Sequence, residues 1–353
     1  MKATHSNEDV KAGTDVVLTV TNLGVGFFPD SARRYDVVRG VHLTLRAGQT
    51  TALVGESGCG KSITAMSVMQ LLPKPHGNIH SGQIFFRQRD GKVVDLAQQD
   101  PTGPLMRRIR GNEIAMIFQE PMTSLNPVFT VGSQIIEVIR LHQKKTAKEA
   151  RQTAVEMLSK VGIADPHKRI DEYPHQMSGG MRQRAMIAMA LSCTPKLLIA
   201  DEPTTALDVT TQAQIMELLM SLVKENKTSL VIVTHNLGLV SRYSERIYVM
   251  YAGRIVESGA TRDILTSPKH PYTMGLLNSV PRLEDEKDKE LVPIEGMPPN
   301  LIDLPDVCPF IPRCRYASDV CTGSRTPGLR LVGDNNHYAA CHLDVEGGAA
   351  YEQ

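Results

Sequence analysis

A glycine-rich octapeptide, Gly55–Ser62, constrains the fold of this chain more than any other segment. Its sequence, GESGCGKS, fits the spacing G-x-x-x-x-G-K-[S/T] of loops that bind nucleotide phosphates. The apolar run Thr51–Val54 before it predicts a strand, and Ser62–Leu72 after it predicts a helix that Pro73 ends. Glycines let successive backbone amides face one phosphate, and the helix N-terminus adds partial positive charge. The segment therefore predicts a nucleotide site at a strand–loop–helix junction.

The end of this loop carries the residues expected to touch the phosphates most directly. Lys61 is expected to bridge the β- and γ-phosphates, and the Ser62 hydroxyl to coordinate Mg²⁺. A chance glycine turn is the alternative, but it does not explain the strand before the loop and the helix after it. The expected nucleotide contacts of this segment are Gly55, Glu56, Ser57, Gly58, Cys59, Gly60, Lys61, Ser62 and Ile63.

Two carboxylates, Asp201 and Glu202, follow a second apolar strand, Leu197–Ala200. A charge at the end of a buried strand is costly unless it meets a cation, so Asp201 is expected to contact Mg²⁺. Glu202 is then free to orient or deprotonate the water that attacks the γ-phosphate. A solvated acidic turn is the alternative. Together with the glycine loop, the pair predicts Mg²⁺-dependent hydrolysis of a nucleoside triphosphate.

Guanine specificity is not supported, because the segment Asn226–Ser229 has Ser where a guanine-reading Asn-Lys-x-Asp motif needs its carboxylate. A second anion-binding turn, Ser178-Gly179-Gly180, precedes the helix predicted for Met181–Leu191. One nucleotide cannot easily use both turns of one subunit. The second turn therefore indicates a site that another chain completes.

The motifs occur in an order that resembles ATP-binding cassette (ABC) ATPases, over about residues 16–262. The resemblance rests on Gly55–Ser62, Gln119, Ser178–Gly180, Asp201-Glu202, Ala206-Leu207-Asp208 and His235. It implies a P-loop NTPase cassette with a mixed sheet covered by helices on both faces, an antiparallel β subdomain and a helical subdomain at about 120–180. Met177 stands where the family usually has Leu, a change that conserves volume and apolarity.

The resemblance also assigns roles to single residues. It implies that Gln119 reaches Mg²⁺ and the attacking water, and that His235 contacts the γ-phosphate and holds the water-activating carboxylate. The alternatives are a surface glutamine and a core histidine. Asp208 is implied to lie at the seam between two cassettes. An aromatic ring is expected to stack on adenine, with Phe27 favoured over Phe28 and Tyr35.

Four longer segments resemble one branch of that family, the ATPases of oligopeptide and dipeptide importers. They are Phe118–Pro127, Tyr173–Gln176, His270–Thr273 and Pro312–Cys314. The resemblance implies two membrane permeases, an extracytoplasmic solute-binding protein and a second ATPase, a paralogue in preference to a copy of this chain. It places the chain at the cytoplasmic face of the inner membrane. Nickel chelates, glutathione and opine-like compounds remain open as solutes beside peptides.

The C-terminal segment contains four of the six cysteines, all within the last 46 residues. Their spacing differs from the paired C-x-x-C of common zinc ribbons, and four thiolates suit either Zn²⁺ or a [4Fe–4S] cluster. The resemblance favours the [4Fe–4S] cluster as a structural clasp; zinc and unligated thiols are the alternatives, and His337 and His342 are possible substitute ligands. The expected ligands are Cys308, Cys314, Cys321 and Cys341.

The chain length predicts two domains. We expect a flexible N-terminus at 1–14, the ATPase domain at 15–262 and a small Cys-rich domain at 263–353. Alternating residues in Val16–Val20 and Val41–Leu45 predict antiparallel strands, whereas strands alternating with helices after residue 110 predict a parallel sheet. Residues 74–110 are polar and contain glycines, and they predict an excursion from this pattern.

Composition excludes several other classes of protein. Hydrophobic residues make up 41% and charged residues 22%, which is typical of a globular chain. The 39 basic and 38 acidic side chains leave a formal charge of +1, so no nucleic-acid partner is expected. A non-transport ABC protein acting on nucleic acid would need a basic stripe or tandem cassettes. No apolar stretch approaches the roughly 18 residues of a membrane span, so we expect a soluble intracellular chain.

Overall fold

The fold is known from a computed structural model of the 353-residue chain. The structure describes residues 15–28, 34–120, 124–205, 207–279, 293–302, 304–333 and 336–344. The N-terminal segment 1–14, for which we predict flexibility, lies outside these residues, and so does Ala206.

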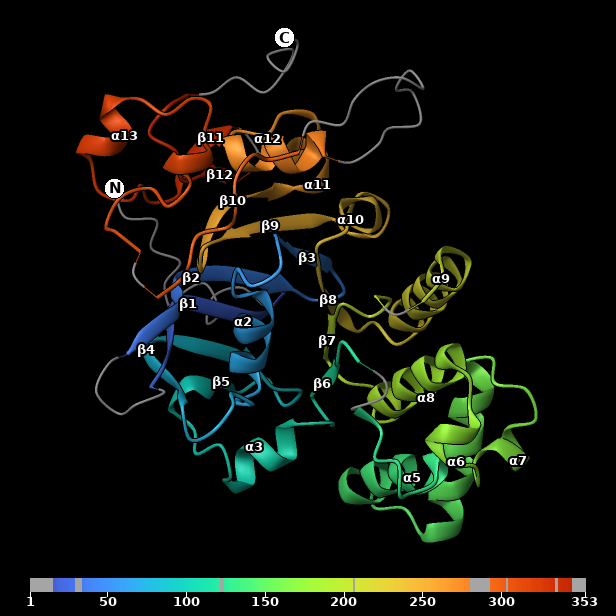
Figure 1. Cartoon of the computed structure of the whole chain (residues 1–353). Helices are drawn as coiled ribbons and strands as arrows, with labels where there is room; N and C mark the ends of the chain where they lie inside the picture. The colour runs from blue at the N-terminus through green and yellow to red at the C-terminus, as the bar shows by residue number, and fades with distance from the viewer. Residues whose placement is uncertain are drawn as a thin grey trace.

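An eight-stranded sheet forms the centre of the molecule (Figure 1). Five of its strands are parallel neighbours, as the buried apolar runs predict, and three antiparallel strands extend one edge. In spatial order the strands are β11 (Arg330–Gly333), β12 (His337–Ala339), β10 (Arg254–Ala260), β9 (Arg246–Tyr251), β3 (Thr50–Val54), β8 (Ser229–Thr234), β7 (Leu197–Asp201) and β6 (Ile114–Ile117).

The register of three parallel strands brings the sequence motifs to one edge of this sheet. Val54 at the end of β3 pairs with Thr234 at the end of β8. Asp201 at the end of β7 pairs with Val233 of β8. The residues that follow these strands, which carry the glycine loop, Glu202 and His235, therefore emerge together.

A second, antiparallel sheet has the strand order β2-β1-β4-β5. Its strands are β1 (Val16–Phe27), β2 (Tyr35–Arg46), β4 (Gly77–Arg87) and β5 (Val93–Asp95). The excursion predicted at 74–110 holds these last two strands, the 3₁₀ helix η1 (Leu96–Gln98) and α3 (Pro104–Ile109), elements that its polar sequence did not predict. Three of its apolar side chains, Phe86, Leu96 and Met106, are fully buried in the core that also contains residues of β1.

The helix after the glycine loop, α2 (Lys61–Val68), packs in the core between the two sheets. It is shorter than the predicted Ser62–Leu72, because the chain turns at Met69 and Gln70 has a φ of 54°. Helices α10 (Leu237–Tyr243) and α11 (Thr261–Thr266) follow β8 and β10.

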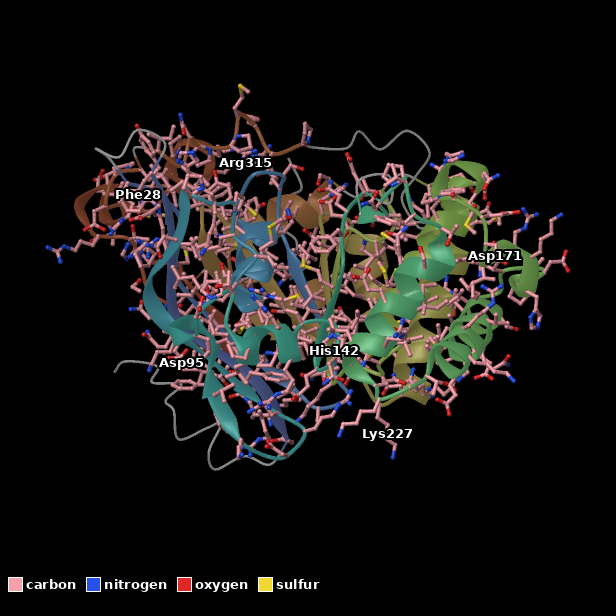
Figure 2. All side chains as sticks on the ribbon, turned by 90° about the horizontal axis from the view of Figure 1, so that it is seen from below. Phe28, Asp95, His142, Asp171, Lys227 and Arg315 are labelled. Atoms are coloured by element: carbon pink, nitrogen blue, oxygen red, sulfur yellow. The ribbon has the colours of Figure 1, made fainter. Side chains whose placement is uncertain are left out.

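A helical body lies to one side of the main sheet (Figure 1). It begins with α5 and α6, each capped by a threonine side chain, and Asp171 lies far out on it in Figure 2. One apolar cluster joins this body to β6 and β7. The elements are α5 (Val131–His142), α6 (Ala147–Lys160), α7 (Pro166–Arg169), η2 (Pro174–Gln176), α8 (Gly179–Leu191) and α9 (Val209–Glu225). No helix within the described ranges has the length and apolar character of a membrane span.

The described residues after 262 join the cassette through its sheet and its core. Strand β12 pairs with β10, where Glu257 lies opposite Ala339, and β11 pairs with β12. Phe310 is buried in the same apolar cluster as Tyr251 of β9. The remaining elements are α12 (Pro271–Asn278), η3 (Ile311–Arg313) and α13 (Asp319–Gly323), and Figure 1 shows α12 and α13 at the end of the sheet formed by β10, β12 and β11.

Candidate nucleotide-binding and catalytic site

The glycine loop connects β3 to α2 and packs closely against the β9–β10 turn. A Cβ atom at Gly60 would lie 2.9 Å from Cε of Met250 and 3.0 Å from the carbonyl oxygen of Val37. Gly60 also has a φ of 106°, which strongly favours glycine. The amide of Gly253 donates to the carbonyl of Cys59 at 2.9 Å. The loop is therefore shaped by a neighbouring turn as well as by its own glycines.

Lys61 is buried, with its ammonium group curled back onto the loop. Its Nζ donates to the carbonyl oxygens of Gly55 at 2.8 Å and Glu56 at 2.9 Å. Cys59 lies nearby, and burial raises the pKa of its thiol, although Lys61 acts in the opposite direction. Ser57 and Gly58 are exposed at the tip of the loop. The side chain of Ile63 is partly buried and packs against the core of the two sheets.

The two residues expected to hold Mg²⁺ are adjacent. The Ser62 hydroxyl donates to Oδ1 of Asp201 at 3.1 Å. Burial raises the pKa of Asp201, and the hydrogen bond from Ser62 partly opposes this shift. Hydroxyl and carboxylate oxygens are the donors that Mg²⁺ prefers, so this pair fits that ion.

Three side chains converge on the carboxylate of Glu202. Nε2 of Gln119 donates to Oε2 at 3.0 Å, and the Thr205 hydroxyl donates to the same oxygen at 2.8 Å. Nδ1 of His235 lies 3.0 Å from Oε1. The structure thus brings together the three residues predicted to be catalytic, Gln119, Glu202 and His235, from three different segments.

The backbone and the hydrogen bonds of Glu202 fix the position of its carboxylate. Its φ of 45° is unusual for a residue other than glycine, and its amide donates to the carbonyl of Val233 at 2.8 Å. Burial acts to raise the pKa of Glu202, but the hydrogen bonds from His235 and Thr205 outweigh burial and leave the pKa below its ordinary value. The carboxylate is therefore held ionised in one position.

The second turn, Ser178–Gly180, begins helix α8 in the helical body. Ser178 caps the helix by accepting from the amide of Met181 at 3.3 Å. Cβ atoms at Gly179 and Gly180 would contact Leu207 at 3.8 Å and Thr211 at 3.4 Å. The turn therefore lies beside the start of α9, and Figure 1 shows α8 separated from α2.

Asp208 caps helix α9 in the same chain. Its Oδ1 accepts from the amide of Thr211 at 2.9 Å, and its Oδ2 accepts from the Thr211 hydroxyl at 2.7 Å. These bonds lower the pKa of the exposed Asp208, and the bond from the Thr211 amide has the larger effect. They describe a cap, and the predicted role at a seam between cassettes stays a prediction.

The aromatic side chains considered for adenine lie at the ends of β1 and β2. Phe27 pairs with Tyr35 in the antiparallel sheet, and its ring packs on Gly77, where a Cβ atom would lie 3.0 Å away. Phe28 donates its amide to the carbonyl of His76 at 3.0 Å. Figure 2 shows Phe28 at the end of the molecule opposite Asp171 and the helical body. The three rings are thus in one region, and the structure does not single out one of them.

Two family models match the chain, one described as ABC transporter over residues 38–205 and one as Oligopeptide/dipeptide transporter, C-terminal region, over 256–321. A peptide import ATP-binding protein of Brucella melitensis is 51% identical over 318 residues, which are 89% of this chain and 93% of that protein. The chain belongs to the peptide-importer family of ABC ATPases. Members of this family hydrolyse ATP, so the chain is an ATPase.

Other relatives in the peptide-importer family are similar over nearly their whole length. The dipeptide transport ATP-binding protein DppD of Bacillus subtilis is 48% identical, covering 93% of this chain and 94% of DppD. The oligopeptide transport protein OppD of the same organism is 46% identical, covering 93% and 88%.

Solved cassettes share the fold of this peptide-importer ATPase. A dimeric ATP-binding cassette in a post-hydrolysis state with ADP and phosphate is 25% identical, with a TM-score of 0.60. The match covers 69% of this chain and 99% of the solved cassette. A cassette of the CbiONQ transporter from Clostridium perfringens has a TM-score of 0.57 at 27% identity, over 71% and 90%. These structures confirm the predicted cassette with a mixed sheet and an antiparallel sheet.

The tail cysteines of this peptide-importer ATPase influence one another. Burial raises the pKa of Cys314 to about 11; the amide of Tyr316 opposes this increase, whereas the sulfur atoms of Cys308, Cys341 and Cys321 add to it. Yet no group of three or more His, Cys, Asp or Glu side chains in the described ranges is arranged to hold a metal ion. The geometry therefore does not support the expected cluster.

The two histidines considered as substitute metal ligands have other partners. Nε2 of His337 lies 2.7 Å from Oε1 of the buried Glu257. Nε2 of His342 lies 3.0 Å from the carbonyl oxygen of Arg325. Both are thus engaged away from the thiols.

Sequence reasoning missed three residues around the site of this peptide-importer ATPase. Thr205 bonds Glu202, and its only signal was its position shortly after the Asp201-Glu202 pair. Tyr272 and Arg313 both contact Glu56 of the glycine loop. They lie in two of the family-like segments, His270–Thr273 and Pro312–Cys314, which indicated family membership but no contact with the loop.

Proposed function

We propose that the chain is the ATP-hydrolysing subunit of an importer for peptides or peptide-like solutes, in which it drives uptake through partner permeases. The observation that supports the ATPase role most directly is the set of three hydrogen bonds on Glu202, next to the Ser62–Asp201 pair. The whole-length similarity to peptide, dipeptide and oligopeptide import proteins supports the solute class.

In this proposal the chain's own residues divide the work of phosphoryl transfer. The amides of Gly55–Gly60 and the Lys61 ammonium bind the β- and γ-phosphates of the substrate ATP, and the ring of Phe27 stacks on adenine. Ser62 and Asp201 hold Mg²⁺, which would neutralise the charge that develops on the phosphates. Lys61 is buried beside this pair, as an electrostatic role requires.

Glu202 takes the proton of the attacking water, and two neighbours keep it in position. Gln119 binds one carboxylate oxygen and orients the water, and His235 binds the other and contacts the γ-phosphate. The lowered pKa of Glu202 keeps the carboxylate ionised at neutral pH. Gln119 also follows β6, which shares an apolar cluster with the helical body. A change at the nucleotide can therefore be transmitted through Gln119 to that body.

A second cassette completes the site through its Ser178–Gly180 turn and Asp208. The position of this turn beside α9, with α8 separated from α2 (Figure 1), supports a partner chain as the source of the second phosphate contact. The proposed partner is a paralogous ATPase. ATP then drives closure because it binds the closed pair more tightly than the open pair, and hydrolysis resets the permeases.

The proposed assembly contains two permeases, a second ATPase and an extracytoplasmic solute-binding protein, with this chain at the cytoplasmic face of the inner membrane. Peptides are the proposed solutes. In this proposal residues 15–262 form the ATPase domain, with the helical subdomain at about 120–180, and residues 263–353 form the C-terminal region.

For the tail we propose a thiolate site with a [4Fe–4S] cluster, or with Zn²⁺ as the alternative. The proposal rests on the four cysteines of the C-terminal segment, Cys308, Cys314, Cys321 and Cys341, whereas the described residues form no group arranged to hold a metal ion. Iron and zinc analysis of the purified full-length chain, with absorbance near 400 nm (roughly where such clusters absorb), provides the test. Cys314→Ser should lose the metal, whereas Cys193→Ser should keep it. A chain without iron or zinc would refute this part of the proposal.

The ATPase proposal is tested by Glu202→Gln and Lys61→Ala. Glu202→Gln should lower kcat about a hundredfold or more, because glutamine keeps the shape of the side chain but cannot accept the proton of the water. ATP should stay bound, and the two cassettes should stay paired. Lys61→Ala should weaken ATP binding itself. Size-exclusion chromatography with ATP and an equilibrium ATP titration measure the two effects. Unchanged hydrolysis by Glu202→Gln would refute the role of Glu202.

A further inference from the structure

Arg313 of the tail forms a paired contact with Glu56 of the phosphate-binding loop. Its two terminal nitrogens donate to the two carboxylate oxygens at 2.7 Å and 3.0 Å. The side chain of Arg313 is 4% exposed and that of Glu56 is 26% exposed. Two parallel hydrogen bonds between a guanidinium and a carboxylate fix both groups in position and orientation. The tail therefore holds the second residue of the Gly55–Ser62 loop directly.

The guanidinium of Arg313 is itself held by the C-terminal part of the chain. Its Nε donates to the carbonyl of Glu295 at 3.0 Å, and one terminal nitrogen lies 3.4 Å from the carbonyl oxygen of Ile294. Its central carbon lies 5.9 Å from the centre of the Tyr251 ring. The bonds to Glu56 raise the pKa of Arg313 above its ordinary value; burial acts in the opposite direction, and Tyr251 adds to the increase. The C-terminal part of the chain and Tyr251 therefore hold the guanidinium of Arg313 in place in addition to its bonds with Glu56.

A second contact holds the backbone of the same loop residue. The amide of Glu56 donates to the hydroxyl of Tyr272 in α12 at 2.9 Å. Tyr272 is fully buried, and its ring packs on Tyr251 and Phe310 at centroid distances of 4.5 Å and 5.5 Å. Both the amide and the carboxylate of Glu56 are thus held by residues that follow position 262.

The charge of Glu56 gives this arrangement a functional consequence. A carboxylate in a loop that surrounds a triphosphate repels the ligand, and the repulsion is strong where water is partly excluded. The Arg313 pair neutralises the carboxylate and fixes its position. The carbonyl of Glu56 also accepts from Nζ of Lys61 at 2.9 Å, so a shift of Glu56 would disturb the lysine as well.

We propose that Arg313, with Tyr272, is a positioning residue for ATP binding, which holds Glu56 in place, neutralises its charge and makes the affinity of the loop depend on the C-terminal region. This inference rests on the proposed nucleotide site at Gly55–Ser62. Arg313 does not touch the nucleotide in this role. Its effect reaches ATP through Glu56.

The experiment is an equilibrium titration with MgATP of four full-length proteins: wild type, Arg313→Gln, the double variant Arg313→Gln/Glu56→Gln, and Arg325→Gln. Arg313→Gln should weaken ATP binding about tenfold, because a charge-assisted pair is lost and Glu56 is left uncompensated. Adding Glu56→Gln to Arg313→Gln should recover most of the lost affinity, because the repelling charge is gone. Arg325→Gln, a tail arginine with a 91% exposed side chain, is the matched control and should bind as wild type.

Steady-state kinetics give a readout that a purely structural role would not produce. Arg313→Gln should raise KM for ATP with kcat nearly unchanged, and adding Glu56→Gln should restore KM. If Arg313→Gln does not fold, as judged by circular dichroism, Tyr272→Phe carries the test and should weaken ATP binding several-fold through loss of the acceptor for the Glu56 amide.

Two results would overturn the inference. One is wild-type affinity of Arg313→Gln or, where that variant does not fold, of Tyr272→Phe. The other is weak binding by Arg313→Gln that Glu56→Gln does not restore, because that assigns Arg313 to packing of the tail alone. Lys61→Ala separates this inference from the proposed function. If Lys61→Ala also binds ATP normally, the proposed nucleotide site itself is wrong. If Lys61→Ala loses ATP binding while Arg313→Gln binds ATP normally, only the positioning role of Arg313 is refuted.

Discussion

Nδ1 of His235 lies 3.0 Å from Oε1 of Glu202, so the residue that follows strand β8 restrains the carboxylate that follows strand β7. The contact exists because the two parallel strands are adjacent and in register, with Asp201 opposite Val233. Neither residue could reach the other if the strands were separated by one more neighbour. The catalytic arrangement therefore depends on strand order.

His235→Ala should lower kcat by about a hundredfold with little change in KM for ATP, because Glu202 loses the partner that fixes one carboxylate oxygen. Steady-state ATPase assays measure both constants. His142→Ala, at the end of α5, is the control and should retain wild-type kcat. A large rise in KM with normal kcat would assign His235 to binding alone.

Thr205→Val should lower kcat by about five- to tenfold, which corresponds to about 1 kcal/mol for the loss of one hydrogen bond to Glu202. Valine keeps the size and branching of threonine but has no hydroxyl. Thr205→Ser keeps the hydroxyl and should recover most of the rate. Equal loss in the two variants would show that the methyl group matters more than the bond.

Gly60→Ala should abolish measurable ATP binding, because the new Cβ would clash with Met250 and Val37 and the φ of 106° disfavours alanine. An ATP titration tests this outcome, and a thermal melt checks that the protein still folds. Gly323→Ala, where nothing lies within 4 Å of the added atom, should bind ATP normally. Tight ATP binding by Gly60→Ala would mean that the loop tolerates a different shape.

His270 should make the protein less stable as the pH falls below about 6.5. Burial lowers its pKa to about 4, so the folded protein keeps it neutral while the unfolded chain binds a proton between these values. Stability should fall by up to about 3 kcal/mol as the pH decreases from about 6.5 to 4, since one pKa unit corresponds to about 1.4 kcal/mol. Urea unfolding at several pH values measures this loss.

His270→Asn is the variant that isolates this effect. Nδ1 of His270 accepts from the amide of Tyr272 at 3.1 Å and caps α12, a role that asparagine performs well. The variant should therefore fold at neutral pH and lose less stability between pH 6.5 and 4 than wild type. The same loss in both proteins would place the acid sensitivity on another group.

Local sequence was sufficient to propose a nucleotide site. The phosphate-binding loop is a continuous segment, and Asp201 and Glu202 directly follow a strand, so each motif carries its own context. The apolar runs in the main sheet were equally readable, because strands buried on both faces need continuous apolar sequence. Thr205 shows the limit, since one threonine after a motif has no pattern that predicts its partner.

Residues 74–110 show a segment whose local sequence predicted an excursion but none of its strands. Strand β4 is mostly half-exposed along its first part, so its sequence does not alternate clearly, and only Ile84, Phe85 and Phe86 are buried. Its place beside β1 comes from pairing across the sheet, which no local pattern specifies.

By itself, the sequence determined the chemistry of this protein: a phosphate-binding loop, a pair of acidic residues, a serine–glycine turn and a family. The tertiary structure alone decided which distant residues meet, such as Glu56 with Arg313, which are 257 positions apart. The physical reason is that a motif depends on local backbone geometry, which nearby residues encode. A contact between Glu56 and the tail depends on how β12 joins β10 and how Phe310 enters the shared core, and these are properties of the whole chain.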